Sequence, residues 1–177
     1  MTEVPGLVPV VIVGAGPVGV AAATFLAQHG VQCVVLDRWA EVYPQPRAVH
    51  LDDEVMRIVG RLGIAERFAA ISRPAQGLQL RDPNMNVLAQ FRRERRETVN
   101  GYPQANMFDQ PEFEALLRAN LKHYPHAVLR GDAEVTGVVQ VGAERAEVAF
   151  VDRVSGRKYR LEARFLLGCD GANSMVR

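Results

Sequence analysis

Short apolar runs and one helical pattern alternate at the start of the chain. Pro9–Val13 is a valine-rich run, typical of a strand that is buried on both faces. Pro17–His29 predicts a helix, because proline suits a first turn and Gly30 supplies a C-terminal stop. The apolar side chains expected on one face of this helix are Val18, Ala22, Phe25 and Leu26. Gln32–Leu36 predicts a second buried strand, which completes a parallel βαβ unit with the usual right-handed crossover.

The middle of the chain predicts a long loop, two helices and a hairpin. Arg38–His50 contains two prolines and no periodicity, and a loop of this length in a compact domain is usually functional. The acidic residues 52–54 then open a helix, where they suit its positive end and need no catalytic role. Ile64–Ile71 predicts a second short helix. Gly77–Asp82 and Asn86–Arg92 predict two strands joined by a turn, and residues 92–97 form a mixed charge run that we interpret as a solvated loop.

The last third predicts one helix followed by strands. Pro111–His123 is the helix, capped by Asp109 or Gln110. Its apolar stripe consists of Phe113, Leu116, Leu117 and Leu121. The strands that follow are Val128–Arg130, Ala133–Val141, Ala146–Asp152, Lys158–Ala163 and Phe165–Cys169. They predict an antiparallel β-meander that feeds a last buried strand. The fold class is therefore α/β, and because an open α/β sheet normally continues with a helix here, we expect the chain to be part of a larger protein.

Composition narrows the function classes. The 177 residues are 48% hydrophobic and 23% charged, which is typical of one globular domain. The net charge of +1 gives no support for binding nucleic acid or an anionic membrane. No apolar run approaches the roughly 20 residues that cross a bilayer. Cys33 and Cys169 lie in apolar runs, so we interpret them as reduced thiols of a cytoplasmic protein, and the four histidines show no metal-site spacing.

A glycine motif carries the clearest chemistry. Gly14, Gly16 and Gly19 lie between the first strand and the first helix, where glycines allow a tight turn, close approach of a pyrophosphate, and packing of helix on strand. The helix end offers unpaired N–H groups to phosphates. Asp37 closes the second strand, where a carboxylate can bind ribose hydroxyls and disfavours a 2′-phosphate. A glycine turn without a ligand is the alternative, and the motif does not separate NAD from FAD.

Two further segments resemble a known family. Residues 168–177, Gly-Cys-Asp-Gly-Ala-Asn-Ser-Met-Val-Arg, look like the Asp-Gly motif of single-component flavoprotein aromatic hydroxylases, the para-hydroxybenzoate hydroxylase family. Residues 46–52, Pro-Arg-Ala-Val-His-Leu-Asp, resemble the arginine-bearing segment of the same family. Within the family, the likeness is strongest to the 3-(3-hydroxyphenyl)propionate hydroxylase group. The resemblance extends over essentially all of the chain and implies a glutathione-reductase-like fold with two dinucleotide-binding regions.

The resemblance implies roles for individual residues. The expected FAD-binding residues are Gly14, Gly16, Pro17, Gly19, Asp37, Arg38, Arg47, Gln110, Val135, Asp170 and Gly171. Among them, Arg38 would lie beside the adenosine, Arg47 would contact the pyrophosphate or ribityl region, and the backbone of Val135 would contact the adenine. Asp170 and Gly171 would serve both FAD and the nicotinamide donor. The plain alternatives are an exposed loop arginine for Arg47, a helix cap for Gln110 and a strand-ending turn for Asp170 and Gly171. The resemblance would also place His50 near the flavin ring.

The implied activity is hydroxylation of a small phenolic substrate. In the family, NADH or NADPH reduces FAD, oxygen adds at flavin C4a, and the hydroperoxide transfers an oxygen atom to the ring. No residue is identified as catalytic. Residues 1–177 would be the N-terminal portion of the FAD-binding domain, with 76–107 a small part of the substrate domain, and the family's later Gly-Asp motif is absent. The alternatives are another FAD- or NAD-dependent oxidoreductase of this fold, and a catalytically silent FAD-binding fragment that forms a homodimer.

Overall fold

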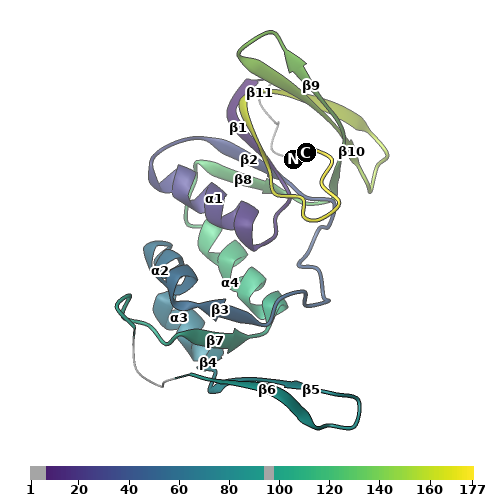
Figure 1. Ribbon diagram of the computed structural model, residues 1–177. Helices are drawn as coiled ribbons and strands as arrows, with labels where there is room; N and C mark the ends of the chain where they lie inside the picture. The colour runs from purple at the N-terminus through teal and green to yellow at the C-terminus, as the bar shows by residue number, and fades with distance from the viewer. Residues whose placement is uncertain (1–6, 94–97) are drawn as a thin grey trace. The chain divides into compact units, whose positions relative to one another are not determined.

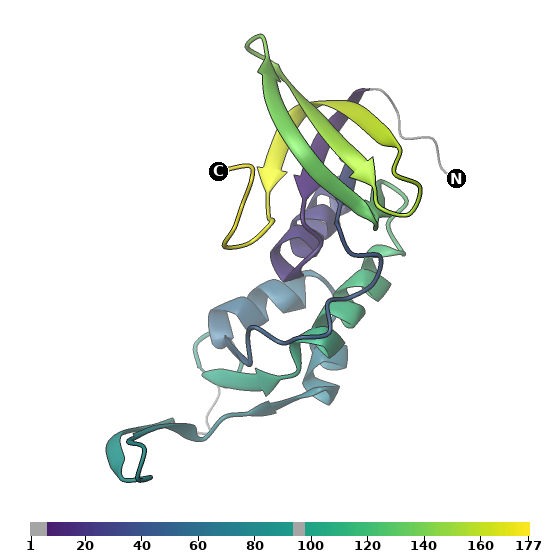
Figure 2. The same cartoon turned by 90° about the vertical axis from the view of Figure 1, so that its right-hand side faces the viewer.

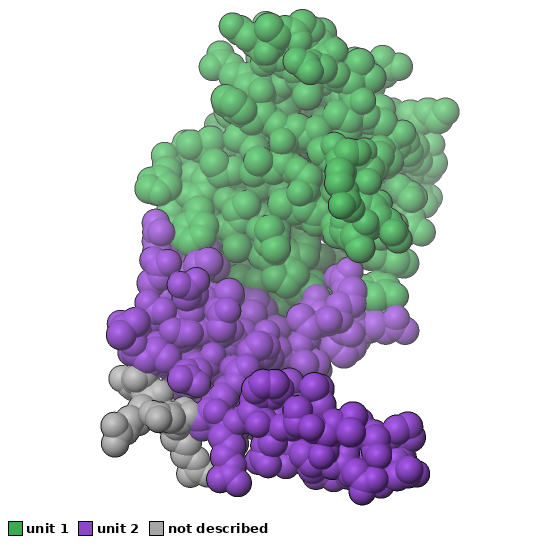
Figure 3. All heavy atoms as spheres, in the orientation of Figure 1, with its two compact units in different colours: residues 1–44, 114–177 green, residues 45–113 purple. Residues whose placement is uncertain are grey.

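The structure is a computed structural model that describes residues 7–93 and 98–177. It divides into two compact units (Figure 3). Unit 1 consists of Met1–Pro44 and Glu114–Arg177, and unit 2 of Gln45–Phe113. We describe each unit by itself. Residues 94–97 of the predicted charged loop lie outside the described residues.

Unit 1 is built on a six-stranded mixed sheet in the order β8-β2-β1-β11-β10-β9 (Figure 1). The strands β8, β2, β1 and β11 are parallel, while β10 runs antiparallel to both β11 and β9. Their bounds are β1 (Leu7–Val13), β2 (Cys33–Leu36), β8 (Ala127–Arg130), β9 (Ala133–Val141), β10 (Arg145–Asp152) and β11 (Lys158–Gly168). The predicted α/β fold class is confirmed.

The predicted βαβ unit is present. β1 and β2 are parallel neighbours, with α1 (Pro17–Gln28) between them in the chain. Pro17 occupies the first turn and Gly30 has a φ of +72°, so both predicted helix ends are correct. The predicted apolar face is not the buried one, since Val18 is 71% exposed. The buried residues are Gly19, Val20, Ala23, Thr24 and Ala27. α1 is apolar on nearly every side, so periodicity could not select its packed face, and the small residues allow the closest approach to the sheet.

The C-terminal strands differ from the prediction in three ways. β8 pairs in parallel with β2 and lies outside the meander, which consists of β9, β10 and the first half of β11. The two strands expected within 158–169 form one continuous strand, β11, whose first half pairs with β10 and whose second half pairs with β1. The last strand is also less buried than expected, because Phe165 is 68% exposed and Leu167 37%. An alternating pattern predicts a strand, but it does not show which strand it pairs with or which residues pack over it.

The main core of unit 1 lies on one face of this sheet, under the twisted ribbon that β9 and β10 form (Figure 2). It joins residues from the parallel strands with residues from the meander. Its members are Val8, Val11, Val13, Val34, Leu36, Ala133, Val135, Val148, Phe150, Leu161 and Ala163. The opposite face holds α1, as in other α/β sheets that are covered on both sides.

Unit 2 contains the two predicted helices, the predicted hairpin and a small sheet that we did not predict. The helices are α2 (Asp53–Arg61), which Asp52 caps through the N–H of Val55, and α3 (Ala65–Ala70). β5 (Gly77–Arg81) and β6 (Val87–Arg92) form the hairpin. The small sheet has the order β3-β7-β4, with bounds β3 (His50–Asp52), β4 (Ser72–Pro74) and β7 (Ala105–Phe108). These strands have only three or four residues, too few to show a period.

The boundary between the two units lies within helix α4 (Gln110–Leu121), between Phe113 and Glu114. The first turn of the helix packs within unit 2, where the ring centroid of Phe113 lies 4.9 Å from Phe68 and 5.4 Å from Phe108. The cap is Asp109, whose carboxylate accepts the N–H of Glu112 at 3.2 Å. Among the described residues, no helix is long and apolar enough to cross a membrane.

Candidate cofactor-binding site

The predicted phosphate loop joins β1 to α1 and is fixed at its start by backbone contacts. The N–H of Gly14 donates to the carbonyl of Leu36 at 2.8 Å, at the end of the neighbouring strand β2. Gly14 has a φ of +102°, which favours glycine. A Cβ at Gly14 would overlap the carbonyl of Cys169, and a Cβ at Gly19 would overlap the carbonyl of Gly14. Both glycines are therefore required by the packing of the protein itself.

Gly16 has a different environment. Its φ is −71°, a value that any residue adopts, and a Cβ built on it would meet nothing within 4 Å. Backbone conformation and packing therefore do not require a glycine at this position, although Gly16 is the N-cap of α1, where glycine is preferred to alanine. It lies directly before Pro17 at the N-terminal end of α1, where backbone N–H groups point out of the helix. The open space above Gly16 is thus next to the best anion-binding position of the loop.

Asp37 contacts the same loop from the end of β2. One oxygen of its carboxylate, Oδ2, accepts the N–H of Ala15 at 2.6 Å, and the other, Oδ1, accepts the N–H of Trp39 at 2.8 Å. The structure therefore brings the predicted ribose-binding acid against the phosphate loop. Arg38, the next residue, has an exposed side chain, and its carbonyl accepts from Arg153 Nη1 at 2.9 Å.

Asp170 and Gly171 lie beside the phosphate loop at the same edge of the sheet. The N–H of Cys169 donates to the carbonyl of Val13 at 2.7 Å, so the end of β11 is tied to the end of β1. The Asp170 carboxylate accepts from Ser174 Oγ at 2.7 Å and from the N–H of Met175 at 2.6 Å. Burial raises the pKa of Asp170, but these hydrogen bonds outweigh it and hold the pKa below its usual value. Gly171 has a φ of +83° and turns the chain.

Val135 lies on β9 and is buried in the core, paired through its backbone with Phe150 of β10. It follows Ala133, whose N–H donates to the carbonyl of Asp37 at 2.8 Å. This contact sets the start of β9 beside the end of β2. In unit 1 the structure thus brings together the loop glycines, Asp37, Asp170 and Gly171 at the carboxyl ends of β1, β2 and β11, with the start of β9 next to them.

Arg47 and Gln110 belong to unit 2, where they are joined. The side-chain oxygen Oε1 of Gln110 accepts the N–H groups of Arg47 and Ala48, both at 2.7 Å. Gln110 is only 5% exposed, so it acts as a buried support for the arginine-bearing segment and the helix cap is Asp109. The side chain of Arg47 is exposed. His50 lies on β3 with its Nε2 3.4 Å from Arg93 Nη1.

Sequence reasoning missed Arg118 of α4. Its Nη1 lies 3.3 Å from the carbonyl oxygen of Ala40, and its Nη2 lies 3.5 Å from the carbonyl oxygen of Ala15 in the phosphate loop. An arginine on an amphipathic helix normally faces solvent, and nothing in the local pattern distinguishes this one.

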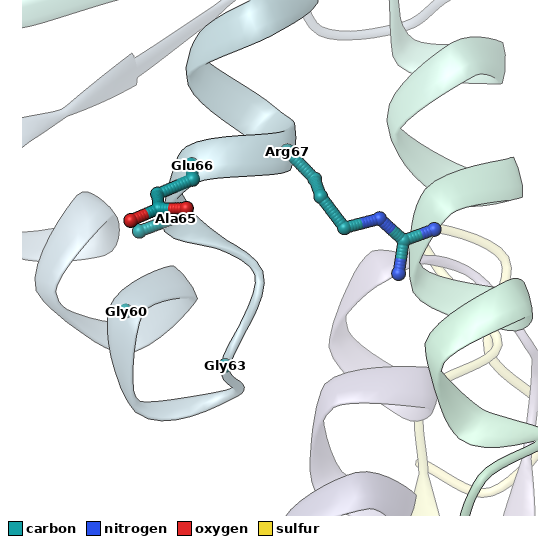
Figure 4. A pocket seen from close by; sticks show the side chains of 5 residues that line it. All are labelled: Gly60, Gly63, Ala65, Glu66 and Arg67. Carbon is teal, nitrogen blue, oxygen red and sulfur yellow. The ribbon is translucent and has the colours of Figure 1, made fainter.

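Unit 2 has a hollow of about 430 Å³ at the junction of α2 and α3 (Figure 4). It is lined by Gly60, Gly63, Ala65, Glu66 and Arg67, none of which is a predicted site residue. In the part of the chain that the structure describes, no cluster of three His, Cys, Asp or Glu side chains is arranged to hold a metal ion.

The fold and these contacts define a dinucleotide-binding α/β domain. The family described as FAD binding domain matches residues 7–177, so the chain belongs to this family. The resemblance stated from the sequence is therefore confirmed.

Curated relatives are about one third identical to the chain over the residues that align with it. It is 34% identical over 176 residues to a 3-(3-hydroxy-phenyl)propionate/3-hydroxycinnamic acid hydroxylase of Mycobacterium avium (strain 104), covering 95% of the chain and 30% of the relative. It is also 34% identical to a "probable NADH-specific resorcinol 4-hydroxylase" of Rhodococcus jostii (strain RHA1), covering 96% and 32%. The chain thus spans about a third of the length of these relatives.

Solved structures agree on the fold. The crystal structure of the flavin-dependent monooxygenase PieE, in complex with FAD and substrate, matches 99% of the chain and 32% of its own length, with a TM-score of 0.83 and 26% identity. The p-nitrophenol 4-monooxygenase PnpA of Pseudomonas putida DLL-E4 matches 98% of the chain and 43% of its own length, with a TM-score of 0.85. At 24% identity, this second likeness is one of fold alone.

Proposed function

We propose that this chain binds FAD at the carboxyl edge of its parallel strands, as the cofactor-binding part of an NAD(P)H-dependent hydroxylase of phenolic compounds. The observation that carries the proposal is the environment of Gly16. Neither the φ of Gly16 nor its packing requires a glycine, and the open space above it suits a molecule that lies against the backbone. The family of the chain supplies the identity of that molecule, FAD.

Different residues at this edge would bind different parts of the dinucleotide. The N-terminal end of α1, with Gly16 and Pro17, would bind the pyrophosphate through backbone N–H groups. Asp37 would accept hydrogen bonds from the ribose with the lone pairs that Ala15 and Trp39 leave free. Asp170, already ordered by Ser174 and Met175, would present backbone groups to the cofactor.

In unit 2, Gln110 holds the segment that carries Arg47, and a fixed guanidinium suits a phosphate oxygen. When FAD is bound, its flavin supplies the redox chemistry. The contribution of the protein is to bind and orient it. We assign no residue as a general base.

The substrate class rests on the relatives. Two of the relatives are named as hydroxylases of hydroxyphenyl compounds, 3-(3-hydroxy-phenyl)propionate and resorcinol. Residues 76–107 are the part that we assign to the substrate domain. In support, they lie in unit 2, and their hairpin β5–β6 carries an apolar face of Leu78, Leu80, Ala89 and Phe91 that suits an aromatic ring.

An FAD titration monitored by quenching of flavin fluorescence tests the cofactor proposal. We expect saturable binding with a Kd in the low micromolar range or tighter. Absence of saturable binding by a folded chain would overturn it.

A second candidate is an FAD-binding chain without hydroxylase activity. Oxidation of NADH or NADPH that depends on added phenol, in the presence of FAD, separates the two. Phenol-dependent oxidation supports the hydroxylase, and saturable FAD binding without it supports the silent chain.

A further inference from the structure

Arg118 connects α4 to two loops of unit 1. Its guanidinium reaches the carbonyl of Ala15 in the phosphate loop and the carbonyl of Ala40 in the segment after β2. Both distances, 3.5 Å and 3.3 Å, are at the long end for a hydrogen bond from N–H to oxygen. One charged side chain therefore spans the glycine loop and the segment that follows Asp37.

Ala15 is held on both sides by charged groups. Its N–H donates to the carboxylate of Asp37 at 2.6 Å, while its carbonyl faces the guanidinium of Arg118. The peptide groups before and after Ala15 are thus oriented by charges of opposite sign. Because Gly16 follows immediately, this pair sets the direction in which the backbone of the loop faces the open space.

Stability alone does not account for the guanidinium. Among the described residues, Arg118 Nε is the buried side-chain atom that lacks a hydrogen-bond partner. A buried N–H without an acceptor is unfavourable, and its two other contacts are long. A methionine would fill similar space beside Leu117 without this disadvantage. The feature that a methionine lacks is a permanent positive charge next to the phosphate loop.

We propose that Arg118 is a positioning residue of the FAD site, which orients the Ala15 peptide and places a positive charge behind the loop that receives the pyrophosphate. This inference rests on the proposed function of the chain. Arg118 acts through the backbone of Ala15 and Ala40, and its charge adds to the positive end of α1. It has the same effect on any ligand that carries the ADP half of FAD.

Three variants test the proposal by FAD titration. Arg118→Met removes both the charge and the hydrogen-bond donors. Arg118→Lys keeps the charge but loses the two guanidinium nitrogens that reach separate carbonyls. Lys122→Met, four residues further along, removes an exposed charge as the matched control. We expect Arg118→Met to raise the Kd about tenfold or more, Arg118→Lys to recover part of this loss, and Lys122→Met to change it less than about twofold. The affinity of Arg118→Met should also depend less steeply on salt.

Equal Kd values for Arg118→Met and Lys122→Met, with both variants folded by thermal unfolding, would overturn the inference. Amide NMR spectra distinguish this failure from that of the proposed function. The nitrogens of Gly16 and Glu41 follow the carbonyls of Ala15 and Ala40, so both signals should shift in Arg118→Met without FAD and stay in place in Lys122→Met. Unshifted signals would contradict the role of Arg118 even if the wild-type chain binds FAD. Shifted signals in a chain that binds no FAD would contradict the proposed function instead.

Discussion

The three glycines of the phosphate loop differ in what surrounds them and in how strongly the fold requires a glycine. Gly14 combines a positive φ with close packing on Cys169, and Gly19 packs on the carbonyl of Gly14. Gly16 has neither constraint. Substitutions by alanine therefore separate the requirements of the fold from those of the ligand, because a methyl group is added at each position with a different neighbour.

Gly16→Ala is expected to leave the fold intact and to weaken FAD binding. The added methyl group meets no protein atom, and the poorer N-cap that alanine provides should lower the midpoint of thermal unfolding by no more than about 4 °C. The FAD Kd should rise about tenfold or more, because the methyl group keeps the pyrophosphate from the backbone. An unchanged Kd in the fluorescence titration would show that no ligand approaches Gly16.

Gly19→Ala is the matched comparison, with the opposite expectation. Its methyl group would overlap the carbonyl of Gly14, so α1 must move away from β1. We expect the free energy of unfolding to fall by about 1–3 kcal/mol, as for other overpacked positions. Chemical denaturation measures this value, and a stability equal to that of Gly16→Ala would contradict the packing argument.

Gln110 is predicted to act through the backbone that it supports. Gln110→Met leaves the N–H groups of Arg47 and Ala48 without their acceptor, which should lower the free energy of unfolding by about 1–3 kcal/mol. Gln110→Glu keeps an oxygen at the same place. Hydrogen exchange should therefore accelerate at residues 47 and 48 in Gln110→Met and not in Gln110→Glu, and equal acceleration in both variants would refute this role.

At the scale of elements, the prediction from sequence was most accurate for segments whose ends are marked by capping or turn residues. α1 lies between Pro17 and Gly30, α2 follows the cap Asp52, and the hairpin β5–β6 encloses an Asp-Pro-Asn turn. The errors concern relations between elements. The partner of β8, the continuity of β11 and the buried face of α1 are decided by contacts distant in sequence, which no local pattern contains.

The candidate site shows the same division. Asp37 and the loop glycines could be predicted because strand, turn and helix are contiguous, and the structure does bring them together. Asp170 was found through the resemblance alone. Arg118 was missed because its contacts with Ala15 and Ala40 arise only when α4 packs in unit 1. An interaction between distant segments leaves no periodic signal in either of them.

The turn between β10 and β11 should respond to acid. The N–H and hydroxyl groups of Ser155 donate to the carboxylate of Asp152, and with the nearby Arg130 guanidinium they lower the pKa of Asp152 to about 2. A carboxylate whose pKa is lower in the folded chain stabilises the fold above its unfolded pKa, and this stabilisation is lost as the pH falls through the folded value. The contribution of Asp152 should therefore be present above its ordinary pKa of 3.8 and disappear towards a pH of about 2.

The amide NMR signal of Ser155 measures this transition directly. Its chemical shift should titrate with a midpoint near a pH of 2 in the wild type. Asp152→Asn, which keeps a side-chain oxygen but does not titrate, should abolish the transition. A midpoint at the ordinary aspartate value would contradict the hydrogen-bonded arrangement.

At the scale of the whole molecule, exposed apolar side chains gather on the hairpin of unit 2. Leu78, Leu80 and Phe91 lie on one face of β5–β6, and each is about half exposed or more. A two-stranded ribbon has little independent stability, so its apolar face is a surface that favours association. The chain spans about a third of relatives whose remaining length is available to cover such faces.

Polar substitutions on this face should reduce the exposed apolar surface without changing the affinity for FAD. For Leu78→Thr combined with Phe91→Thr, we expect less binding of a hydrophobic fluorescent dye and a Kd for FAD within about twofold of the wild type, because threonine keeps strand propensity. Paired strand signals lost from the NMR spectrum would instead show that the apolar face holds the hairpin together.

The contact of Gly14 with Cys169 has a consequence for biosynthesis. The glycine loop of residues 14–19 is translated well before its neighbour at the end of β11, about 150 residues further along the chain. A nascent chain that has only reached β10 therefore contains the whole loop sequence without the surface on which Gly14 rests. Binding of FAD to this loop during synthesis would then have to wait until β11 has emerged from the ribosome and inserted between β1 and β10.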